Sequence, residues 1–90
     1  MCKRIAVVAA VLDHPELCAA SFNKEVASFH GIIKGRMGIP FDDEEMAVIS
    51  LTVVGELDEI NALTGRLGRI PGINVKTAIS AKEIAPHDVK

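Results

Sequence analysis

The sequence predicts an α+β domain, a two-layer βαββαβ sandwich in which two helices cover one face of a four-stranded antiparallel sheet. Two strongly apolar runs, at 5–12 and 46–54, have the length of strands and lack a helical period. The segments at 15–29 and 56–70 carry apolar residues three or four apart, as amphipathic helices do. Right-handed crossovers between such elements place both helices on the same side of the sheet.

The chain begins with a strand predicted over residues 3–12, which is apolar on both faces from Ile5 onward. Such strands are typical of the middle of a sheet. Asp13-His14-Pro15 then predicts a helix start, because Asp13 or His14 can cap the helix and proline suits its first turn. The helix is predicted to bury one stripe, made of Leu17, Cys18, Phe22, Val26 and Phe29.

A weaker strand is predicted over 32–39, followed by an acidic connection at 41–45 and the apolar strand at 46–54. Gly35 and Gly38 weaken the first of these strands and indicate an edge position or a bulge. The alternation predicts Ile33, Met37 and Ile39 on one face, with Lys34 and Arg36 on the other.

The second helix begins near Glu56 and is predicted to bury Leu57, Ile60, Leu63, Leu67 and Ile70. Gly65 and Gly68 lie inside it, where each costs about 1 kcal/mol relative to alanine. That cost favours a close approach of the sheet or of a second subunit at these glycines. Pro71-Gly72 ends the helix, and clean alternation over 73–80 predicts the last strand.

Ninety residues support one domain, expected over 1–80, with a polar C-terminal tail at 81–90. The composition, 49% hydrophobic and 24% charged, is apolar for so small a chain. The central strands leave uncharged side chains on the sheet face that no helix covers. An apolar face of this kind usually marks a contact surface. We therefore expect a homo-oligomer, a dimer or a tetramer, formed through the open sheet face.

Charge and aromatic content argue against direct binding of nucleic acid. The net charge is −2, and the chain has three Phe and no Tyr or Trp to stack on bases.

The apolar run at 5–12 is too short to span a bilayer, and it is followed by Asp13 instead of a small-residue cleavage site. We expect a cytoplasmic protein without membrane contact.

No residue spacing indicates catalysis, a metal site or a cofactor. The serines lack a histidine at a diagnostic spacing, so the chain is predicted not to be an enzyme. The side chains that could bind metal are His14, His30, His87, Cys2 and Cys18. No two of them have the short spacing of a metal motif, and no metal site is predicted. Cys18 lies on the apolar stripe and is expected to be a core residue.

Two weak candidates for ligand binding remain. Asp13 and His14 lie where backbone amides at a helix start favour an anion, although Glu16 opposes one and a plain helix cap is the simpler interpretation. Arg36 beside Gly38 could hold a carboxylate or phosphate through two hydrogen bonds. The alternative is that Arg36 is an edge-strand charge that discourages aggregation.

Four segments carry a family resemblance: Arg36–Pro40, Glu45–Ser50, Ala62–Gly68 and Pro71–Thr77. Over roughly residues 3–80 the chain resembles the iron-only hydrogenase system regulators. That resemblance implies an ACT-like, ferredoxin-like fold related to the C-terminal domain of nickel-responsive regulators. It also implies a regulatory link to hydrogenase assembly. The histidine and cysteine pattern of the nickel regulators is not reproduced.

The sequence and the resemblance together favour a non-catalytic ACT-like regulatory domain that oligomerises and senses a small ligand or a protein partner. ACT domains hold effectors near the first strand–helix turn, which corresponds here to Asp13 and His14. One alternative is a pure interaction scaffold that binds no small molecule. A less favoured alternative is a small dimeric ferredoxin-like enzyme.

Overall fold

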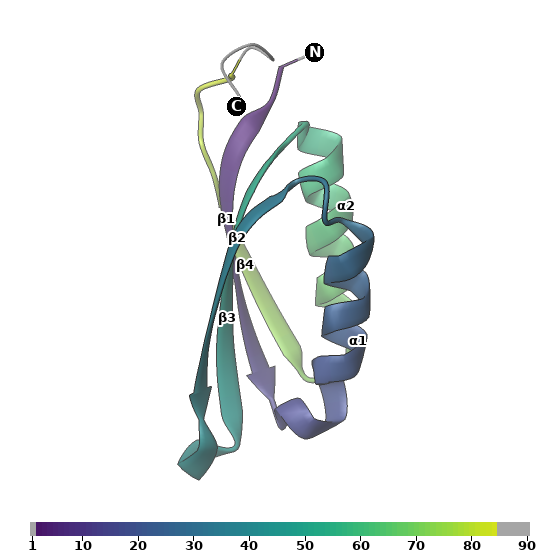
Figure 1. Ribbon diagram of the computed structural model, residues 1–90, viewed down its shortest axis with the longest axis vertical. Coiled ribbons are helices and arrows are strands. Elements are labelled where there is room, and N and C mark those ends of the chain that lie inside the picture. Colours follow the sequence, from purple (N-terminus) through teal and green to yellow (C-terminus); the bar gives the residue numbers. More distant parts are fainter. Residues whose placement is uncertain (1, 85–90) are drawn as a thin grey trace.

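The computed structural model describes residues 2–84 and confirms the predicted element order. The elements are β1 (Arg4–Asp13), α1 (Pro15–Ser28), β2 (Ile33–Phe41), the 3₁₀ turn η1 (Asp42–Glu44), β3 (Met46–Gly55), α2 (Leu57–Gly68) and β4 (Ile73–Ile79). The four strands form one antiparallel sheet in the order β2-β3-β1-β4. The two most apolar strands, β1 and β3, are central as predicted. Both helices cover the same face, and no helix or strand of the described residues lies on the opposite, bare face (Figure 1).

The core lies between the sheet and the two helices. Alternate residues of the central strands point into it, including Val8 and Leu51, which are fully buried. Phe22 of α1 is the largest of the fully buried side chains. From α2 the core receives Ile60, Leu63 and Leu67. Burial of this shared apolar layer holds the helices on the sheet.

Two leucines predicted to be buried are exposed instead. Leu17 is 81% exposed, because it lies five residues before Phe22 and so about 140° away from it around the helix. The buried stripe of α1 is narrower, with Cys18, Phe22 and Val26 at intervals of four. Leu57, at the first position of α2, is 41% exposed.

A β-bulge changes the face that most of β2 presents. The register shifts between Ile33 and Gly35, so that one extra residue is accommodated there. Ile33 pairs opposite Val53 on the helix side, whereas Met37 pairs opposite Ser50 on the bare side. The predicted grouping of Ile33 with Met37 and Ile39 is therefore wrong. The edge position and the bulge that the glycines indicated are both present.

The glycines of α2 do not mark a close approach within the protomer. A Cβ at Gly65 or Gly68 would meet no atom within 4 Å among the residues that the structure describes. The tight positions are Gly55, whose Cβ would lie 3.0 Å from Ile32 Cγ2, and Gly72. Gly72 has a φ of +88°, and its Cβ would lie 3.2 Å from the Asp13 carbonyl oxygen.

The two helices begin differently. At α2 the Glu56 N–H donates to Glu59 Oε1 at 2.9 Å, which satisfies one backbone donor at the helix start. At α1 the cap residue is His14, in a left-handed conformation with φ 52°, and no side chain among residues 2–84 caps the helix. The predicted side-chain cap from Asp13 or His14 is therefore wrong. Pro15 occupies the first turn as expected.

The first residues of the C-terminal tail return to the start of β1. Lys3 N–H donates to the Ile84 carbonyl at 2.9 Å, and Ile84 N–H donates back to Lys3 at 2.6 Å. Arg4 and Glu83 form an ion pair at 3.4 Å beside this bridge.

Residues 85–90, which include the potential metal ligand His87, lie outside the described part. Neither helix found in residues 2–84 has the length and apolar content required to cross a bilayer.

Candidate functional site

The most extensive surface feature is the bare side of the sheet, which we call the open face. It consists of Ile5, Val7, Ala9 and Val11 of β1; Met46, Val48, Ser50, Thr52 and Val54 of β3; Met37, Ile39 and Phe41 of β2; and Asn74, Lys76 and Ala78 of β4. Two charged side chains lie at the margins of this face. Asp13 ends β1 opposite Met46, and Lys76 belongs to the edge strand β4.

Large apolar side chains of the open face are strongly exposed. Ile5 and Val7 in the central strand are 43% and 45% exposed, and Met37 in the edge strand is 64% exposed. Ile39 and Phe41 extend the patch along β2, at 47% and 44%. A contiguous patch of this kind on a small domain usually marks an interaction site.

A second feature is the turn between β1 and α1, where backbone contacts join three parts of the chain. Asp13 N–H donates to the Gly72 carbonyl at 2.7 Å, which ties the turn to the start of β4. His14 N–H donates to the Glu45 carbonyl at 2.9 Å, which ties it to the β2–β3 connection. The backbone of the turn is thereby fixed from both sides.

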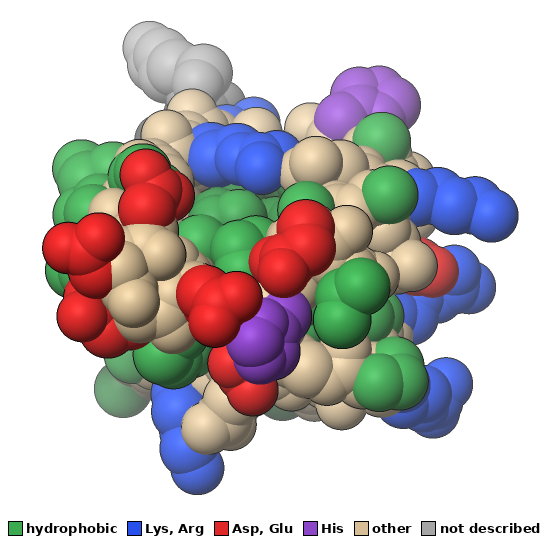
Figure 2. Space-filling model, turned by 90° about the horizontal axis from the view of Figure 1, so that it is seen from below, with side chains coloured by type: hydrophobic (Ala, Val, Ile, Leu, Met, Phe, Trp, Pro, Cys, Tyr) green, Lys and Arg blue, Asp and Glu red, His purple; other side chains and the backbone are tan. Residues whose placement is uncertain are grey.

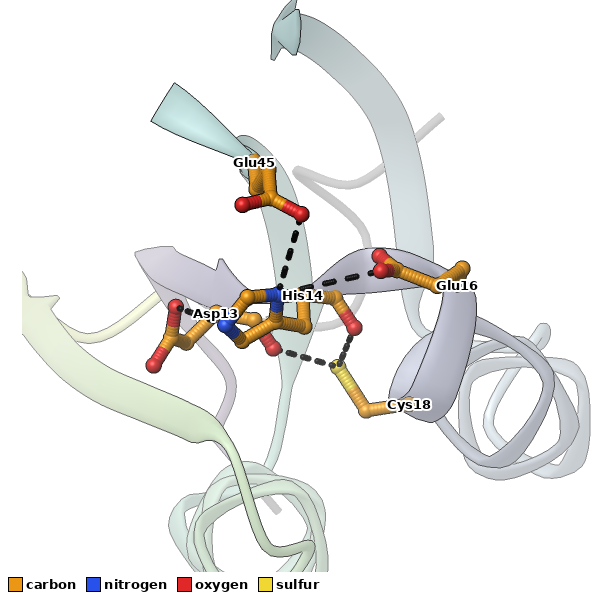
Figure 3. Close-up of polar contacts among 5 residues, drawn as sticks. All are labelled: Asp13, His14, Glu16, Cys18 and Glu45. Carbon is orange, nitrogen blue, oxygen red and sulfur yellow. Dashed lines mark hydrogen bonds and ion pairs between the residues drawn. The ribbon is translucent and has the colours of Figure 1, made fainter. Parts of the chain in front are cut away.

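Three carboxylates surround the His14 imidazole (Figure 3). Nδ1 lies 3.7 Å from Glu16 Oε2 and 3.7 Å from Glu45 Oε1. Nε2 lies 3.8 Å from Asp13 Oδ1. The acidic turn η1 directly precedes Glu45, and acidic side chains gather around a histidine at this end of the molecule (Figure 2). This negative charge opposes the anionic ligand that a helix start alone would favour.

Cys18 lies beneath the turn and is buried, as predicted. Its thiol is 3.7 Å from the Asp13 carbonyl oxygen and 3.9 Å from that of His14. Burial, together with the charges of Glu16 and Asp13, raises the pKa of the Cys18 thiol above its ordinary value. Because the thiolate is the reactive form, Cys18 is poorly suited to act as a nucleophile or redox sensor.

Arg36 and Gly38 are not brought together with Asp13 and His14. They pair opposite Leu51 and Ile49, on the helix side of β2. The Arg36 guanidinium donates to Asn23 Oδ1 at 2.7 Å and lies over the Phe22 ring, 5.6 Å from its centroid. It therefore contacts the middle of α1 at Asn23, which is nine residues after His14 and, at the rise of a helix, about 13 Å away from it. From the sequence we considered Arg36 as a ligand contact or as an exposed edge-strand charge, and this contact with α1, a tether between strand and helix, was not predicted.

Replacing Arg36 with alanine should lower the free energy of unfolding by about 1 kcal/mol, because it removes one exposed cation–π contact and one hydrogen bond. Urea denaturation measures this difference. Lys34→Ala on the same strand is the matched control and should change stability by less than about 0.5 kcal/mol. Equal effects of the two substitutions would contradict the tether.

Two of the three acidic partners of His14, Glu16 and Glu45, were not identified as site residues from the sequence. Glu16 was considered as a charge that opposes an anion, and Glu45 as part of the acidic connection at 41–45. Glu45 is 31 residues from His14, so no local spacing connects them. The signal that connects them is the sheet register, because the end of β1 pairs with the start of β3, Asp13 opposite Met46.

Comparisons with known proteins agree with the resemblance in sequence. Residues 4–77 match the TM1266-like family, described as "Iron-only hydrogenase system regulator, putative". The structure of the uncharacterized protein TM1266 from Thermotoga maritima is similar with a TM-score of 0.82 and 35% identity, over 86% of this chain and 96% of that one. No curated protein matches the chain.

Two more distant structures share only the fold. The cofactor-independent oxygenase SnoaB from Streptomyces nogalater has a TM-score of 0.56 at 11% identity, over 93% of this chain and 98% of that one. Protein SO0527 from Shewanella oneidensis has a TM-score of 0.56 at 12% identity, over 92% and 94%. Since one of these is an enzyme, the fold does not decide the activity. The family match extends over most of the described chain, and the protein belongs to the TM1266-like family of iron-only hydrogenase system regulators.

Proposed function

We propose that the chain is a non-catalytic regulatory domain that self-associates through the open face and senses a small ligand or a protein partner as an oligomer. The exposed apolar surface of three adjacent strands is the observation that carries this proposal. The family description supports a regulatory role and names no ligand. The raised pKa of the Cys18 thiol also argues against the buried cysteine as a catalytic nucleophile.

A second copy of the chain is the partner that best fits the open face. Apolar side chains of β1, β2 and β3 make up most of the face, and its charged side chains, Asp13 and Lys76, lie at the end of β1 and on the edge strand β4. Two copies related by a two-fold axis would bury the apolar centre and leave these charges at the rim. The covered side of the same sheet already shows how such side chains pack, since helices bury its alternate residues. Self-association would add an equivalent layer on the other side.

Sedimentation velocity at micromolar concentration tests the self-association. We expect a dimer or a tetramer for the wild-type chain and a monomer for Val7→Glu, which places a charge in the middle of the open face. Leu17→Glu is the control, because Leu17 is exposed on the helix layer and its substitution should leave the oligomer intact. Circular dichroism should confirm that both variants are folded.

Two results would contradict the oligomer. The first is a monomeric wild-type chain, and the second is an oligomer that Leu17→Glu dissociates and Val7→Glu does not.

A thermal-shift screen of amino acids and nucleotides tests the sensing role, because a ligand that binds the native state raises the unfolding temperature. Self-association without any shift would favour an interaction scaffold over a sensor.

A further inference from the structure

Three side chains from separate parts of the chain converge beside the β1–α1 turn. His14 immediately precedes α1, Glu16 lies in its first turn, and Glu45 follows η1. One ligand atom from each lies within 4.8 Å of the others. We propose that His14, Glu16 and Glu45 bind one divalent transition-metal ion, with Asp13 orienting the imidazole.

The distances lie close to those of a coordination shell. Nitrogen and oxygen atoms bound to one ion at about 2.1 Å lie roughly 3.0–3.4 Å apart in octahedral or tetrahedral geometry. His14 Nδ1 is 3.7 Å from an oxygen of each glutamate, so the shell needs only small inward movements. The three side chains are 46%, 61% and 65% exposed, and their torsions are free to make such movements.

The backbone that carries two of these ligands is held rigidly. Among residues 2–84, His14 and Glu45 are the two non-glycine residues with positive φ, at 52° and 54°. The hydrogen bond from His14 N–H to the Glu45 carbonyl joins them directly at 2.9 Å. The positions of the two Cα atoms are therefore set before an ion arrives, and binding would order side chains alone.

The charge of the cluster favours a cation. Asp13, Glu16 and Glu45 all approach one imidazole. In the described chain the arginine ion pairs are Arg4–Glu83 and Arg66–Glu25, which lie elsewhere. Three carboxylates close together repel one another, and a divalent cation between them relieves that repulsion.

The donor set indicates which class of ion would bind. One imidazole nitrogen with two carboxylate oxygens suits zinc and its first-row neighbours, whereas magnesium and calcium prefer oxygen ligands alone. Asp13 faces the other ring nitrogen, Nε2, at 3.8 Å. A carboxylate in this position typically orients a metal-binding histidine and increases its basicity.

Cobalt(II) is the probe for this site, because its visible spectrum reports the ligands that it binds. All titrations use the Cys2→Ser background, since Cys2 is an exposed thiol that could bind the ion independently. We expect one Co²⁺ per chain by calorimetry, with no thiolate charge-transfer band and much weaker binding of Mg²⁺. His14→Asn and Glu45→Gln should each weaken Co²⁺ binding at least tenfold.

Matched substitutions distinguish this site from general attraction to negative charge. Glu44→Gln removes one charge from the same connection as Glu45, and His30→Asn removes another exposed histidine. Both should bind Co²⁺ within about twofold of the background chain, because surface charges outside the shell act weakly. Failure to bind Co²⁺ at millimolar concentration would overturn the proposal. So would equal losses in Glu44→Gln and Glu45→Gln.

Discussion

Replacing Phe22 with alanine is expected to lower the free energy of unfolding by about 3–5 kcal/mol, the range for deletion of a buried aromatic side chain. Phe22 is completely buried between α1 and the sheet, and its ring also supports the Arg36 guanidinium. A domain of this length has a total stability of roughly 5–13 kcal/mol, so the substitution removes a large part of it. Urea denaturation followed by circular dichroism measures the loss.

The same helix supplies a control for this prediction. Leu17→Ala removes a large apolar side chain that is 81% exposed, and it should change stability by less than about 0.5 kcal/mol. A loss of similar size in both variants would mean that α1 is rotated from the orientation described here. Because Arg36 contacts the Phe22 ring, the effects of Phe22→Ala and Arg36→Ala should be less than additive.

Gly72→Ala is expected to lower the free energy of unfolding by about 1–3 kcal/mol, because an L side chain is strained at positive φ. Gly72 has a φ of +88°, and an added Cβ would lie 3.2 Å from the carbonyl oxygen of Asp13. That oxygen belongs to a backbone fixed by the 2.7 Å hydrogen bond from Asp13 N–H to Gly72. The neighbouring atom is therefore poorly able to move away. Thermal and urea unfolding of the single variant measure the cost.

Gly65→Ala should change the free energy of unfolding in the opposite direction and stabilise the protein. Gly65 lies inside α2 with nothing within 4 Å of an added Cβ, so alanine should raise stability by about 0.5–1 kcal/mol through its higher helix propensity. If Gly65→Ala destabilised the protein, a neighbouring subunit would have to pack against α2. If Gly72→Ala were neutral, the turn would have to adopt a different backbone conformation in solution.

The fold was predictable because its main signals are local and redundant. The uncharged stretch from Ile5 to Val11 indicated a central strand, and the strand order of the sheet places β1 between β3 and β4. The change of period at Pro71-Gly72 indicated the end of a helix and the start of a strand, as observed. The uncovered sheet face followed from the same reasoning, because right-handed crossovers place both helices on one side.

The details that sequence analysis did not predict depend on position in three dimensions. Leu17 matches a helical period but lies too far around α1 to reach the sheet. The tether from Arg36 to Asn23 crosses from β2 to α1, and no spacing along the chain encodes it. The approach of Glu45 to His14 likewise depends on the register of β1 against β3.

The bulge at Lys34 has a consequence for the chemistry of the molecular surface. Because strand side chains alternate, one extra residue exchanges the faces of everything that follows it in β2. With an uninterrupted register, Arg36 would project from the uncovered side, and Met37, Ile39 and Phe41 would turn toward the helices. Deleting Lys34 would remove the bulge and leave the residues from Gly35 onward opposite the same partners, so Met37, Ile39 and Phe41 would stay on the open face. The bulge therefore decides which side chains of the edge strand face a partner, because it lets β2 carry one more residue without turning its apolar side chains away from the open face.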